Sequence, residues 1–86
     1  MFGIYLAMVS RFDNAKFLKT RFSGNKLVVE AASKLGEAAE IYEQILKLMR
    51  NGITPHEREQ IVNLLFQAAK CEEDAGKLLI KASLHE

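Results

Sequence analysis

The residues with most chemical potential lie in AAKCEEDAGKLL at 68–79, where Cys71 stands beside Glu72, Glu73 and Asp74. A catalytic thiol would need a nearby base and a lowered pKa, because the thiolate is the nucleophile. Neighbouring carboxylates act in the opposite direction and raise a thiol pKa. The sequence therefore predicts that Cys71 is a small buried side chain on a helix and not a nucleophile.

The two histidines are too far apart to cooperate. His56 and His85 are 29 residues apart, which is about 40 Å along one continuous helix. The pair His56-Glu57 begins a zinc-protease motif, but the second histidine of that motif would fall on Gln60. The chain also has no Glu-x-x-His pair and no glycine-rich phosphate loop. We therefore expect no catalytic residue, no metal ligand, no cofactor and no enzyme activity.

Two turn signals divide the chain into three helices. In NGITPHERE at 51–59, Asn51-Gly52 can end one helix through a left-handed residue. Thr54 can cap the next helix, Pro55 fits its first position, and Glu57 completes a capping box. SGN at 23–25 is the other break. The prediction is one domain over residues 1–86, with helices at about 2–22, 25–51 and 55–83.

Apolar residues recur every three or four positions, as expected for helices that pack on one face. Because the connections are short, neighbouring helices must be antiparallel. The predicted fold is all-α, an up-down-up bundle of three long helices. A second apolar edge lies outside the main stripes and predicts that self-association, most simply as a two-fold dimer, completes the bundle. Its members are Ile41, Leu48, Val62, Phe66 and Ile80.

Glu72 falls near the centre of the apolar face of the third helix, where an unpaired carboxylate is costly. Counting residues outward from the turns places Lys16 closest, so a buried ion pair between Lys16 and Glu72 is predicted, with Lys34 or Arg11 as second choices. The same count places Tyr42 about two turns away from Glu72. The alternative is that Glu72 reaches solvent at the edge of the helix.

Charge is distributed unevenly along the chain. Residues 1–26 carry five basic residues and one acid, a net +4, whereas the rest carries seven basic residues and ten acids, a net −3. The basic segment can dock on the acidic remainder, or contact nucleic acid or anionic lipid. The uncharged start MFGIYLAMV is too short to span a bilayer and lacks the features of a signal peptide. A single cysteine fits the cytoplasm. We expect no membrane partner and regard a nucleic-acid partner as a third choice.

Three segments resemble a known family: NAKFLKTRF at 14–22, LGEAAEIYEQILKLM at 35–49 and LLFQAAKCEEDAGKLL at 64–79. They are similar to the C-terminal helical domain that follows the papain-like acyltransferase domain in butirosin-biosynthesis-protein-H-like proteins. In that resemblance, Phe17-Leu18 opens one helix, Tyr42 stands where a tryptophan is expected, and Ala69, Glu72 and Ala75 form an Ala-x-x-Glu-x-x-Ala pattern. The family's catalytic residues lie in a domain outside these segments, so the resemblance implies a non-catalytic appendage.

These observations predict a helical interaction or oligomerisation module, which forms a homodimer or packs on a neighbouring protein domain. The alternative is a small regulatory or scaffold protein that binds a partner helix in a groove. Contact with nucleic acid through the basic N-terminal segment is the third possibility.

Overall fold

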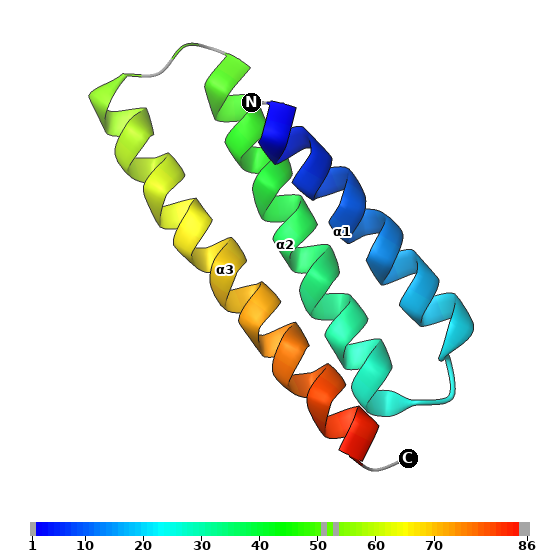
Figure 1. The fold of residues 1–86 in the computed structure, drawn as a ribbon. Helices are drawn as coiled ribbons and strands as arrows, with labels where there is room; N and C mark the ends of the chain where they lie inside the picture. Colours follow the sequence, from blue (N-terminus) through cyan, green and yellow to red (C-terminus); the bar gives the residue numbers. More distant parts are fainter. Residues whose placement is uncertain (1, 51, 53, 85–86) are drawn as a thin grey trace.

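The computed structural model describes residues 2–50, 52 and 54–84, and in this part of the chain the predicted all-α class is confirmed. The helices are α1 (Phe2–Arg21), α2 (Lys26–Arg50) and α3 (Pro55–Leu84). They run up, down and up, with α2 between the other two (Figure 1). The molecule is elongated, with Cα extents of 48 × 19 × 15 Å.

The turns are built by the local chemistry of a few residues. Asn25 caps α2, because its Oδ1 accepts hydrogen bonds from the amides of Leu27 (3.1 Å) and Val28 (3.2 Å). Gly52 adopts a left-handed φ of 84°, which only glycine adopts at no steric cost. Asn51, the other half of that predicted exit, lies outside the described residues.

Thr54 caps α3. The amide of Glu57 donates to Thr54 Oγ1 (3.2 Å), and the Thr54 hydroxyl donates to Glu57 Oε1 (3.2 Å). The amide of Arg58 donates to the Thr54 carbonyl (2.9 Å), which is the first turn of the helix. Helix α3 then begins at Pro55, so the cap and the first helical residue stand at the predicted positions.

The helices do not close around one central axis. Helices α1 and α3 both pack on α2, but their Cα atoms stay more than 8 Å apart throughout the described residues. The three helices of the predicted up-down-up bundle therefore form an open arrangement with α2 in the middle. The predicted completion of the bundle by self-association stays a prediction.

The small residues of α2 explain this arrangement. Two lines of buried residues run along α2 at seven-residue spacing: Ala31, Ala38 and Ile45 on one, and Ala32, Ala39 and Leu46 on the other. Adjacent positions on a helix point about 100° apart, so α2 presents two flanks, and each flank takes one neighbour. Helix α3 carries a matching seven-residue line of buried alanines, Ala68, Ala75 and Ala82.

The consequence is an alanine-rich core with many large apolar side chains outside it. Among the described side chains, Ile45 is the only large one that is fully buried. Exposed large hydrophobic residues include Tyr5, Leu6, Phe12, Phe17, Phe22, Val62, Leu65, Phe66, Ile80 and Leu84. Isolated exposed apolar residues are ordinary, but this concentration indicates a contact surface.

Candidate functional site

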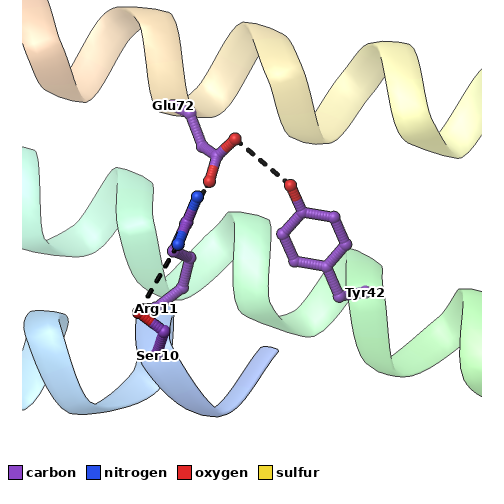
Figure 2. Close-up of polar contacts among 4 residues, drawn as sticks. All are labelled: Ser10, Arg11, Tyr42 and Glu72. Atoms are coloured by element: carbon purple, nitrogen blue, oxygen red, sulfur yellow. Dashed lines mark hydrogen bonds and ion pairs between the residues drawn. The ribbon is translucent and has the colours of Figure 1, made fainter. Parts of the chain in front are cut away.

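A polar cluster joins all three helices. Arg11 of α1 donates from Nε to Glu72 Oε1 of α3, and the hydroxyl of Tyr42 on α2 donates to Glu72 Oε2 at 3.1 Å. Arg11 Nη1 lies 3.5 Å from the Ser10 hydroxyl oxygen. Figure 2 shows the Arg11 and Tyr42 side chains converging on the Glu72 carboxylate across α2. Both carboxylate oxygens of Glu72 are therefore bonded.

The cluster lies at intermediate depth. The side chains of Arg11 and Glu72 are 32% and 26% exposed. Arg11–Glu72 is the only ion pair between different helices in the described part of the chain; the other four join residues three or four positions apart. Burial and the adjacent Glu72 charge raise the pKa of Tyr42 above its usual value, and the Arg11 charge partly offsets this.

The prediction of Lys16 as the partner of Glu72 is wrong, and one of the second choices, Arg11, is correct. Lys16 is exposed, and no acid of the described residues lies within ion-pairing distance of it. Lys16 follows Arg11 by five residues, which places it about 140° round the helix and on a different face. Lys34, the remaining choice, lies 3.7 Å from Glu37.

Tyr42 is a partner of Glu72 as well, although the residue count placed it about two turns away. The hydrogen bond between Cys71 and Glu37 shows that these two residues are level. Tyr42 is then level with Phe66, six residues before Glu72, or about 9 Å along the axis. Side chains lean toward the N-terminus of their own helix, so on antiparallel helices Tyr42 and Glu72 lean toward each other.

Cys71 is half-buried beside α2. Its thiol donates to Glu37 Oε2 at 3.6 Å. Burial raises the pKa of Cys71 most, followed by the charge of Glu37; Lys34 lowers it, and Asp74 adds a smaller upward effect. The carboxylate that raises the pKa of Cys71 most is thus Glu37, on the neighbouring helix. The spacing of residues in the sequence does not predict this contact. A thiol with a raised pKa has little nucleophilic thiolate at neutral pH.

The predicted interface residues are divided between two regions. Ile41 and Phe66 line one groove between α2 and α3, and Leu48 lines the adjoining groove. Val62 and Ile80 line neither of these grooves, but they are 45% and 63% exposed. Phe66 is 72% exposed, so the apolar edge of α3 does face solvent in the single chain.

The described residues include no cluster of three or more histidine, cysteine or acidic side chains with the geometry to hold a metal ion. His56 is exposed in the first turn of α3, and His85 lies outside the described residues. None of the helices described has the length and apolar character needed to cross a membrane.

Comparison of the chain with protein-family models, curated proteins and solved structures gave no match.

Proposed function

We propose that this chain is a non-catalytic helical interaction and oligomerisation module that forms a homodimer. The supporting observation is the amount of exposed surface. The single chain exposes 5880 Å², whereas a monomeric protein of its 9.7 kDa mass typically exposes about 5100 Å². The excess of about 750 Å² is close to the area of about 800 Å² that each partner buries in a standard interface.

The character of the exposed residues supports the same proposal. Phe66 and Ile80 on α3, and Phe17 on α1, are each at least 60% exposed. Covering a large apolar side chain contributes about 1.5–3 kcal/mol. A two-fold contact through the apolar edge of α3 would cover Phe66 and Ile80 of both copies at once.

The resemblance to the helical appendage of papain-like acyltransferases stays a prediction, and it is compatible with this proposal. In such a protein, the same apolar edge would pack on the catalytic domain. A cytoplasmic location is also part of the proposal, because a single cysteine without a disulfide partner is compatible with a reducing compartment.

The groove between α2 and α3 favours one alternative, a scaffold protein that binds a helix of another protein. Ile41 and Phe66 give that groove an apolar part, and Gln44 and Gln67 give it hydrogen-bonding groups. An amphipathic helix is the kind of ligand that such a groove accepts. This alternative is favoured if the purified chain is a monomer and forms a complex only when another protein is added.

The variant Phe66→Lys tests the proposed homodimer. The expected result is a dimer for the wild type and at least about tenfold weaker association for the variant, because the removed apolar contact corresponds to more than about 1.4 kcal/mol. Light scattering after size exclusion gives the mass. The matched control is Leu84→Lys, which places the same charge at a 78% exposed position at the end of α3. If Phe66→Lys and Leu84→Lys give equal masses, the predicted apolar edge is not the contact.

A further inference from the structure

We infer that two copies of this chain dock through an antiparallel contact between their α3 helices, with Phe66 of each copy seated against Gly76 of the other. The inference rests on the proposed homodimer and names its contact surface and register. The two-fold axis runs between the two α3 helices at the level of Cys71, perpendicular to both helices, and lies in the plane of the contact.

The contact surface is the edge of α3 that faces away from α2. In Figure 1, α3 lies along one side of the molecule, and within the described residues α2 is the only helix whose Cα atoms come within 8 Å of those of α3. The buried alanines of α3 mark the side toward α2. A second row of residues lies about 140° round the helix from these alanines. We call this row the outer seam, and its members are Val62, Phe66, Ala69, Glu73, Gly76 and Ile80.

The spacing of the outer seam is that of a helix that pairs with another helix. Successive members are four, three, four, three and four residues apart, which is the alternation found in coiled coils. Val62, Phe66 and Ile80 are 45%, 72% and 63% exposed. Ala69 and Glu73 are exposed as well. The seam thus has the geometry of a helix contact, and the single chain leaves most of it open to solvent.

The residues of the seam are complementary to the same seam read in the opposite direction. In an antiparallel pair centred on Cys71, residues equally far before and after Cys71 face each other. Val62 and Ile80 are each nine residues from Cys71, and Phe66 and Gly76 are each five residues from it. Two β-branched side chains therefore meet, and the largest residue of the seam meets the smallest. Facing positions that alternate in size are what interdigitated packing requires.

Gly76 supports this register independently. It lies in the interior of α3, where glycine lowers helix stability relative to alanine. A Cβ added at Gly76 would meet nothing within 4 Å, so packing among the described residues does not require a glycine here. The facing Phe66 ring of a second copy does, because a helix bearing that ring approaches closely only where the opposite position is small.

Charge selects the antiparallel direction. Glu73 is the charged member of the seam, and a parallel pair would place the two Glu73 carboxylates against each other. In the antiparallel pair, Glu73 faces the small Ala69, and Lys70 of the same copy as that alanine lies one residue farther along. Side chains lean toward the N-terminus of their own helix, which brings Lys70 and Glu73 of different copies together. In the single chain these two residues pair with Asp74 (3.4 Å) and Lys77 (3.0 Å) on their own helix.

The size of the seam agrees with the exposed area. The seam from Val62 to Ile80 is about 27 Å long. The chain exposes about 750 Å² more than a typical monomer of its mass, which is close to what one copy buries in a standard interface. Leu65, which is 41% exposed, lies beside the seam and adds to the apolar area. Ile41 and Leu48 of the predicted interface lie on α2, outside this contact.

Cysteine cross-linking tests the register. The background variant Cys71→Ala removes the native thiol, and either Val62→Cys or Ile80→Cys is added to it. In the antiparallel dimer, two thiols introduced at the same position are about 27 Å apart along the helices, too far for a disulfide. A mixture of the two variants places unlike positions opposite each other. The expected result under mild oxidation is a two-chain band on a non-reducing gel from the mixture and from neither variant alone.

An exchange of the large and small residues tests the seating of Phe66. Phe66→Ala leaves a gap and Gly76→Leu creates a clash, so each is expected to weaken association at least about tenfold in light scattering. Phe66→Ala/Gly76→Leu is expected to recover most of this loss, because a large and a small residue again face each other. The matched control is Gly36→Leu, at a glycine inside α2 where a Cβ also meets nothing within 4 Å. It should leave association unchanged, and far-UV circular dichroism shows that each variant is helical.

Each outcome decides the inference. Cross-linking confined to the mixture, together with recovery in the double variant, supports it. A wild-type dimer with cross-links in the separate variants, with none in the mixture, or with no recovery in the double variant overturns the antiparallel register while the homodimer stands. A wild-type chain that is monomeric in light scattering overturns both the register and the proposed function.

Discussion

The cluster of Arg11, Tyr42 and Glu72 predicts a measurable coupling between α1 and α3. The two perturbations are Arg11→Met, which keeps most of the length of the side chain, and Glu72→Gln, which keeps an oxygen to accept the Tyr42 hydrogen bond. If the ion pair stabilises the fold, each single change costs free energy, and the double change costs less than the sum.

The magnitude follows from the depth of the pair. Hydrogen bonds to charged groups contribute about 1.5–3 kcal/mol when shielded, whereas exposed ion pairs contribute about 0.2–1 kcal/mol. The side chains of Arg11 and Glu72 are 32% and 26% exposed, so the pair lies between the shielded and the exposed case. The expected coupling is therefore about 1–2 kcal/mol. For a domain of this size, 1 kcal/mol shifts the melting temperature by about 4–8 °C.

Urea denaturation of the four proteins at one fixed protein concentration measures this coupling, since self-association makes stability depend on concentration. The matched control is the cycle of Lys16→Met with Glu72→Gln, which should be additive within about 0.5 kcal/mol. Additive changes in the Arg11 cycle, or equal coupling in the Lys16 cycle, would refute the assignment of Arg11 as the partner.

Three further predictions concern local features. Thr54→Ala should cost about 1 kcal/mol in urea denaturation, because the amide of Glu57 loses its capping acceptor; an unchanged midpoint would show that the cap contributes nothing. Gly36→Ala should stabilise the chain by up to about 1 kcal/mol, since a Cβ there meets nothing within 4 Å; a loss of stability would mean that another helix packs at that position. In Tyr5→Phe, Tyr42 is the only tyrosine, and its absorbance at 295 nm should titrate above the usual pKa of 10.0. Because the folded pKa is raised, the contribution to stability is complete below pH 10 and is lost as pH rises through the folded value; an unshifted titration would contradict the burial of the ring.

Local signals in the sequence predicted the helices well. Thr54, Pro55 and Glu57 specify a helix start through groups only three residues apart, so no tertiary information is needed. Gly52 likewise specifies its own left-handed conformation. Asn25 caps α2, whereas the SGN segment alone predicts only a break.

The arrangement of the helices depended on information that sequence patterns do not carry. The apolar stripe of α2 predicts one face, but the buried Ala38 and Ala39 point about 100° apart on a helix that packs against two neighbours. Periodicity shows that a residue is on an apolar face and does not show how many helices share that face.

The partners of Glu72 show the same limit at atomic scale. The predicted burial of Glu72 was enough to predict that its carboxylate has a partner. Which residue is the partner depends on how the three helices are aligned along their axes. Counting residues from the turns ignored the lean of side chains along each helix, which brings Tyr42 and Glu72 together. The contact of Cys71 with Glu37 depends on the same interhelical register.

Sedimentation equilibrium of the wild-type chain at several micromolar concentrations tests the proposed homodimer most directly. The predicted result is a mass that approaches twice the 9.7 kDa of one chain as concentration rises. A mass of one chain at every concentration would contradict the proposal that this molecule is an oligomerisation module.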